Sequence, residues 1–172
     1  MRYIGELPAM NFEVRLEAKR ISGYDFFCGL TFPAAKQSAD SKDGKKPPKT
    51  VTPKTFEGDA DAPCCTLILG GWGGGLTGIS SIDHMDAANN ATTGVEKFEK
   101  GKWYQVRLRV TENRFEAWLG EDKIIDQDTK DKRLSMRPGD IEMSVPFGIQ
   151  HVPDDRGDPR DQDRRGRWTG GP

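Results

Sequence analysis

Residues 70–90 hold the densest group of side chains that could do chemistry. Five glycines and Trp72 fill residues 70–75, and a polar run follows. A flat indole ring can stack on the apolar face of a sugar, while carboxylates, amides and hydroxyls bind its ring hydroxyls. The segment offers all of these groups in Trp72, Ser80, Ser81, Asp83, His84, Asp86, Asn89 and Asn90. This mixture predicts a saccharide site in which Trp72, the serines and the asparagines contact the ligand.

The acids of this run are the candidates for catalysis. Glycoside hydrolysis commonly uses two carboxyl groups that lie about 5 to 9.5 Å apart. Asp83 and Asp86 are paired acids close to an aromatic residue, and His84 between them could act as a general base. Two alternatives stay open. Asp and Asn in loops commonly bind local backbone amides, and a lone loop histidine is usually just solvated. Trp72 could equally pack over the glycine-rich bend.

Other residues of these types fit structural roles. Glu13, Glu17 and Glu142 stand on predicted strands and fit the solvated face of a sheet, whereas Trp103 and Trp118 are expected in the core. No cofactor is expected. The loop 83–90 offers oxygen ligands for a structural calcium ion, an alternative that stays open although EF-hand spacing is absent.

The cysteines do not predict a metal site. Cys28, Cys64 and Cys65 show neither CxxC spacing nor a companion histidine cluster, which argues against zinc. We expect ordinary buried thiols, with a bridge from Cys28 to one of the adjacent pair as the alternative.

Charge and hydropathy exclude several classes of partner. The 26 basic and 27 acidic residues are interspersed over the patterned part and give a net charge of −1, which argues against nucleic-acid binding. No apolar run of about 18 residues predicts a membrane span. The N-terminus lacks the apolar stretch of an export signal, and the compartment is left undetermined.

Period-2 alternation dominates the apolar segments, so the chain is predicted to be all-β. Residues 11–21 and 25–32 read as a hairpin. Residues 64–69 form a further strand, residues 103–128 an antiparallel meander of three strands, and residues 141–149 a last strand. About seven short strands without a helix predict a two-sheet sandwich.

Two segments differ in composition from the rest. Residues 34–63 are rich in Lys, Asp, Pro and Ala and predict a mobile insertion loop within a domain spanning residues 1–149. Residues 150–172 predict a disordered tail. Codons for this tail, shifted by one base, can encode a closing strand, so we hypothesise a frameshift that replaced it; a natural disordered tail is the alternative. Without that strand a sheet edge would be unpaired and would favour self-association.

The segments "DFFCGLTFP", "CTLILGGWGGGLTGISSIDHMDA", "FEKGKWYQVRLRVTENRFEAWLGEDKIIDQD", "RLSMRPGD" and "IEMSVPFGI" resemble the 3-keto-disaccharide hydrolase family, a relative of the concanavalin A-like lectins and glucanases. The resemblance covers roughly residues 6–149. It implies an antiparallel jelly roll that handles carbohydrate, hydrolyses oxidised disaccharides and comes from a longer, exported protein. The Glu-x-Asp-x-x-Glu pattern of the glucanases is absent. A non-catalytic carbohydrate-binding or laminin-G-like interaction module is therefore the alternative.

Overall fold

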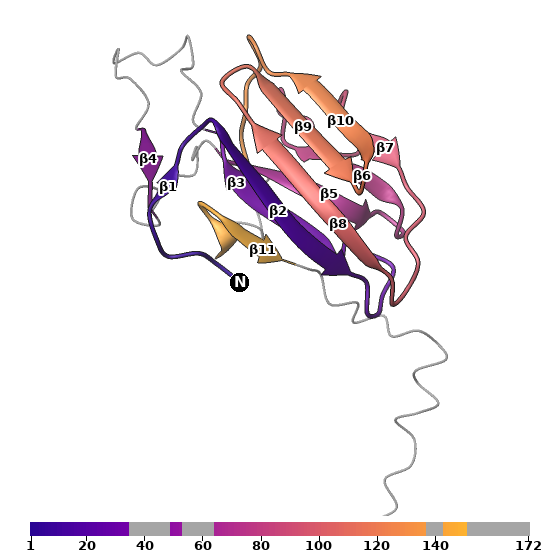
Figure 1. Ribbon diagram of the computed structural model, residues 1–172. Coiled ribbons are helices and arrows are strands. Elements are labelled where there is room, and N and C mark those ends of the chain that lie inside the picture. The colour runs from indigo at the N-terminus through magenta and orange to yellow at the C-terminus, as the bar shows by residue number, and fades with distance from the viewer. Residues whose placement is uncertain (35–48, 53–63, 137–142, 151–172) are drawn as a thin grey trace, which may run out of the picture.

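The computed structural model describes residues 1–34, 49–52, 64–136 and 143–150. The predicted insertion loop 34–63 lies mostly outside these ranges. The predicted tail lies outside them except for Gln150, which belongs to a strand. The described residues form antiparallel sheets, as the alternation predicted, and Figure 1 shows the two larger sheets as layers of a β-sandwich-like body.

The front layer in Figure 1 is a four-stranded sheet in the order β10-β9-β8-β2. Its strands are β2 (Phe12–Lys19), β8 (Trp103–Val110), β9 (Arg114–Leu119) and β10 (Asp122–Asp128). The last three follow one another along the chain and pair in turn, which confirms the predicted meander. Side chains alternate between the core and the solvent, as the pleat of a half-buried strand requires.

The second layer is a five-stranded sheet in the order β11-β3-β5-β6-β7. Its strands are β3 (Cys28–Pro33), β5 (Cys64–Gly71), β6 (Leu76–Ser80), β7 (Gly94–Val95) and β11 (Gly148–Gln150). A short separate pair joins β1 (Leu7–Pro8) to β4 (Thr50–Val51), whose residues fall within the predicted insertion loop.

The predicted hairpin of residues 11–21 and 25–32 is wrong, although both strands exist. β2 pairs with β8, whereas β3 pairs with β5 and β11, so the connection between them crosses from one sheet to the other. Burial explains the difference. Every residue of β3 is buried, as in a strand with neighbours on both sides and cover on both faces, while β2 is half-buried at a sheet edge.

The predicted strand 141–149 is shorter in the structure. Among the described residues of that range, strand pairing begins only at Gly148. Pro146 has no amide hydrogen to donate to a ladder, which limits pairing at that point. Residues 1–3 extend the sheet beyond β11, because Arg2 pairs with Gly148 and the Tyr3 amide donates to the Phe147 carbonyl at 2.9 Å.

The main core lies between the two sheets. Phe32 of β3 and Phe115 of β9 are fully buried and meet edge to face, with ring centroids 5.3 Å apart. Around them pack buried aliphatic side chains from both layers, among them Leu67, Leu69, Ile79, Val106 and Leu108. Burying each such side chain stabilises the fold by about 1.5 to 3 kcal/mol. This core fixes the register that places the outward-facing residues described next.

Candidate functional site

Asp83 and His84 form the tip of a tight turn at the far end of β6. Both have positive φ, 53° and 64°, and the flanking Ile82 and Met85 exchange backbone hydrogen bonds of 3.0 and 2.9 Å. Two central residues with positive φ are typical of a type I′ turn, in which Asp is a favoured residue. The position of these two residues is therefore accounted for by turn formation.

The Asp83 carboxylate is engaged by the segment that packs beside it. It accepts hydrogen bonds from Lys132 Nζ at 2.8 Å and from the Arg133 amide at 2.9 Å. The hydrogen bond from Lys132 is the largest cause of a lowered Asp83 pKa, followed by that of the Arg133 amide. A carboxylate held ionised in this way is a poor general acid.

Asp86, Asn89 and Asn90 organise the loop that returns to β7. Asp86 Oδ1 accepts hydrogen bonds from the Ala88 amide and from Asn89 Nδ2, at 3.0 and 2.8 Å. Asn90 Nδ2 donates to the carbonyls of Ile79, Met85 and Asp86, at 2.8, 3.1 and 2.7 Å. These are the local backbone contacts that Asx residues commonly make.

Ser80, the last residue of β6, and Ser81, which follows it, are buried rather than presented on a surface. Their hydroxyls lie 3.3 Å apart, and the Ser81 backbone pairs with Ser135 through hydrogen bonds of 2.7 and 3.2 Å. Both side chains therefore contribute to packing in this structure.

Trp72 and the acids lie at opposite ends of β6. Trp72 is in the turn before Leu76, whereas Asp83 and Asp86 follow Ser80. Five strand residues span about 17 Å. The structure thus brings His84, Asp86, Asn89 and Asn90 into one loop region with Asp83, but it does not bring Trp72 to them.

Arg20 fixes the glycine-rich turn that carries Trp72. Its Nη2 atom donates to the carbonyls of Gly70 and Gly74 at 3.1 and 2.7 Å, and its guanidinium lies 5.2 Å from the centroid of the Phe27 ring. Burial lowers the pKa of this guanidinium. Gly70 has a φ of 79°, and a Cβ atom there would clash with Arg20, so glycine is required.

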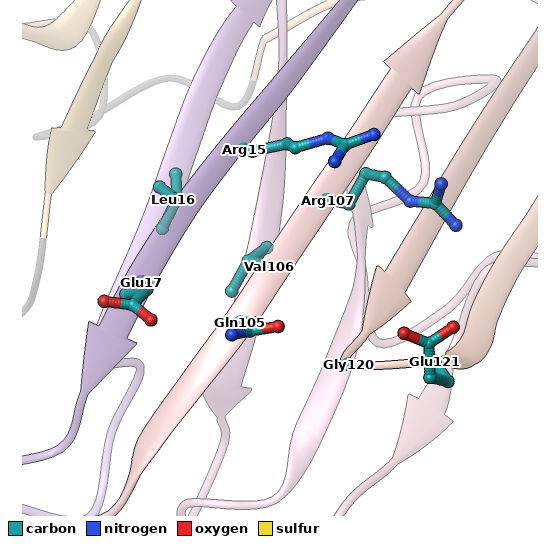
Figure 2. A pocket seen from close by; sticks show the side chains of 8 residues that line it. All are labelled: Arg15, Leu16, Glu17, Gln105, Val106, Arg107, Gly120 and Glu121. Carbon is teal, nitrogen blue, oxygen red and sulfur yellow. The ribbon is translucent and has the colours of Figure 1, made fainter.

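At the same end of the molecule, the outer face of the four-stranded sheet is hollowed. A hollow of about 420 Å³ lies over β2, β8 and the turn between β9 and β10 (Figure 2), lined by Arg15, Leu16, Glu17, Gln105, Val106, Arg107, Gly120 and Glu121. A second hollow of about 480 Å³ adjoins it and shares Glu17, Gln105 and Gly120. Its other lining residues include the exposed Trp103 and also Phe98, Tyr104 and Leu119, which pack in or against the core, so this second hollow lies at the end of the sheet.

The carboxylates of this outer face fall into two groups. Glu13 is paired with Arg15 and Arg109, and Glu116 is paired with Lys123 and Arg109. Glu17 and Glu121, in contrast, have no ion-pair partner in the part of the chain that the structure describes. Both line the first hollow, where Glu17 stands directly opposite Gln105 in the sheet. The hollow therefore offers carboxylate and amide groups to a polar ligand.

The two tryptophans of this sheet differ from the core positions expected for them. Trp103 lies on the outer face with 59 % of its surface exposed, so the prediction that it is a core residue is wrong. Trp118 is buried, but on the outer face, where the Arg107 guanidinium covers it at 3.8 Å from the ring centroid. The physical reason is the register: Trp103 has the same parity along β8 as Gln105, Arg107 and Arg109, all on the solvent side.

No protein-family profile, curated protein or solved structure matches this chain.

Among the described residues, no group of three or more His, Cys, Asp or Glu side chains is arranged to hold a metal ion. For the calcium alternative, the loop 83–90 fits poorly, since Asp83 and Asp86 already accept the hydrogen bonds given above. Within the described ranges, none of the secondary-structure elements is a helix capable of crossing a bilayer.

The hollows were missed because the sequence shows only alternation there. The alternation predicts that Glu17 lies on a solvated face, and the structure confirms that Glu17 is exposed. The available signal was that Trp103 shares its strand face with Gln105 and Arg107, an aromatic next to polar groups at two-residue spacing. The sequence alone does not show that β2 pairs with β8, and it is this pairing that sets Glu17 beside Gln105.

Proposed function

We propose that this chain is a concanavalin A-like jelly-roll domain that binds a saccharide in two adjoining hollows, one on the outer face of the four-stranded sheet and one at the end of that sheet. The observation that carries the proposal is the position of Glu17 and Gln105, which line both hollows, next to the exposed ring of Trp103. The resemblance to 3-keto-disaccharide hydrolases supports the choice of a saccharide as ligand.

The chemistry of the lining suits a sugar. Lys19 Nζ lies over the Trp103 ring at 4.6 Å from its centroid, and the part of this exposed ring that Lys19 leaves uncovered offers an apolar platform. Glu17 and Glu121 accept hydrogen bonds from hydroxyls, Arg15 and Arg107 donate them, and Gln105 does both. A neutral saccharide is favoured over a strongly charged ligand, because both signs of charge line the same hollow.

Hydrolysis of the bound saccharide is the second candidate function, and one observation supports it. Glu17 and Glu121 are two carboxylates without ion pairs among the described residues, and both line a single hollow. One could protonate a leaving oxygen while the other activates water or attacks the sugar. The alternative to hydrolysis is a module that binds the saccharide without turning it over.

The test combines a glycan array with a hydrolysis assay on methyl 3-keto-glucosides, using the full chain. Trp103→Ala is expected to weaken saccharide binding at least tenfold, whereas the control Val95→Ala, also exposed but outside the hollows, keeps it. Turnover that Glu121→Gln abolishes without loss of binding supports an enzyme, and binding without turnover supports a module. If the wild-type chain binds no saccharide on the array and turns none over, the proposal is wrong.

A further inference from the structure

β2 presents a long sheet edge that no described residue covers. It ends the strand order β10-β9-β8-β2, and its eight residues pair with β8 in regular register, without a bulge. The other edges are protected by familiar devices: β7 spans two residues, residues 1–3 extend the sheet beyond β11, and β10 carries a bulge between Lys123 and Ile125. Among the described strands, β2 therefore stands out as an edge available for pairing.

The side chains behind this edge are incompletely covered. Val14 and Leu16 point toward the core but are only half-buried, whereas Val106 and Leu108 on the neighbouring β8 are buried. β2 and β11 lie on the same side of the sandwich (Figure 1), and Ile149 of β11 is half-buried as well. An apolar margin is thus left along one side of the two layers.

We infer that β2 pairs antiparallel with β2 of a second copy of this chain, about a two-fold axis at Leu16. In that register Arg15 stands opposite Glu17 of the second copy, and Glu13 stands opposite its Lys19. By symmetry each pair occurs twice, so four pairs of opposite charge face one another across the junction. On the core side Leu16 meets its own copy and Val14 meets Ala18, which continues the apolar face.

The charge pattern selects this register over its neighbours. A shift of two residues, with the axis at Arg15, would place Arg15 opposite itself and Glu13 opposite Glu17, which sets like charges face to face. A shift of one residue would turn the outer face of the second copy to the opposite side. β10 offers no comparable pattern, because it carries three acids, Asp122, Asp126 and Asp128, against the one base Lys123 and is interrupted by a bulge.

The groups needed at the centre of the junction are accessible. The Arg15 side chain is 73 % exposed although it is ion-paired with Glu13 of its own strand, and Glu17 is exposed and has no ion-pair partner among the described residues. The resulting dimer would have one continuous eight-stranded sheet, with the hollows of both copies on the same face. A two-fold pairing of this kind closes after two chains and does not propagate into a fibre.

The oligomeric state of the full chain tests the inference. Sedimentation velocity and light scattering are expected to show a dimer that dissociates on dilution. Arg15→Glu and Glu17→Arg should each raise the dissociation constant about tenfold or more, since each turns two attractive pairs into two repulsive ones. The double variant Arg15→Glu with Glu17→Arg restores opposite charges and should restore the dimer. Circular dichroism checks that all variants fold.

A crosslink tests the register. Leu16→Cys should form an intermolecular disulfide under mild oxidation, because residue 16 faces its own copy within disulfide reach. Val14→Cys is the matched control, since the two copies of residue 14 would lie about 14 Å apart and should not crosslink. A chain that stays monomeric at all concentrations overturns the inference, as does a double variant no more dimeric than the single ones. These experiments measure the mass of the particle and not ligand binding. A dimer that binds no saccharide would therefore contradict the proposed function and leave this inference intact.

Discussion

Lys132 donates a hydrogen bond of 2.8 Å to the carboxylate of Asp83, joining two segments that are 49 residues apart in the sequence. The backbone of the same segment adds a second hydrogen bond to that carboxylate, from the Arg133 amide. These contacts favour a structural role for the acid that the sequence made the first candidate for catalysis. Removing an acid with a structural role should change stability, whereas removing a catalytic acid should change activity.

Asp83→Ala should lower the free energy of unfolding by about 1 kcal/mol, because the Arg133 amide and Lys132 lose their acceptor at a partly exposed site. Urea unfolding measures this change. Glu112→Ala, an exposed acid in the turn after β8, is the control and should leave stability nearly unchanged. Saccharide binding by Asp83→Ala should equal that of the wild type. A large loss of binding with unchanged stability would instead restore the catalytic assignment.

Acid should destabilise the wild-type chain more than an Asp83→Asn variant. The pKa of Asp83 is lowered in the folded chain, chiefly by the hydrogen bond from Lys132. The unfolded chain then binds more protons, so the contribution of Asp83 is fully present above its unfolded pKa, near 4, and is lost as pH falls through the lower folded value. Unfolding free energies measured between about pH 6 and pH 2 should fall less steeply for Asp83→Asn. Parallel curves for the two proteins would contradict the expectation.

Arg20→Lys should loosen the glycine-rich turn. The strongly hydrated ammonium of lysine costs more to bury than the guanidinium that packs on Phe27, and weakening the hydrogen bonds that Nη2 donates to the carbonyls of Gly70 and Gly74 should cost about 2 kcal/mol. Hydrogen exchange should speed up at the Gly74 amide, which donates to the Gly71 carbonyl at 3.1 Å. Exchange at the Thr111 amide, which follows the end of β8 that is far from Arg20, serves as the internal control. Equal exchange at Gly74 in both proteins would show that Arg20 does not hold the turn.

The three cysteines should resist thiol reagents in the folded chain. All are buried and free, which confirms the expectation of ordinary thiols, and burial raises the pKa of Cys28 and Cys64 to about 12. Because the thiolate is the reactive form, a disulfide-exchange reagent should label almost none of them until denaturant is added, when all three should react. Rapid labelling of a cysteine without denaturant would contradict the burial.

Much of the fold followed from the residues themselves. The meander was predictable because Val106, Leu108 and Val110 alternate with polar residues and turn-forming residues separate the strands. The partner of β2 was not predictable, because alternation fixes which face is buried but not which strand lies alongside. That one pairing decides which residues share the outer face.

The candidate site was harder to predict for a related reason. Trp72 and Asp83 are eleven residues apart in the sequence, and a compact loop would have brought them together; the intervening strand β6 separates them instead. Trp103 and Glu17 are far apart in the sequence and come to one hollow only through the sheet.

Chemical-shift mapping with a methyl 3-keto-glucoside, or with the best saccharide from the array, tests the central claim most directly. Amide spectra of the wild-type chain should show saturable shifts at Gln105 and Gly120, which line both hollows, and at the indole of Trp103. The amides of Asp83, His84 and Asp86 should not move. Shifts confined to the turn and loop after β6, with Gln105 and Gly120 unchanged, would contradict the assignment of the saccharide to the outer face of the four-stranded sheet.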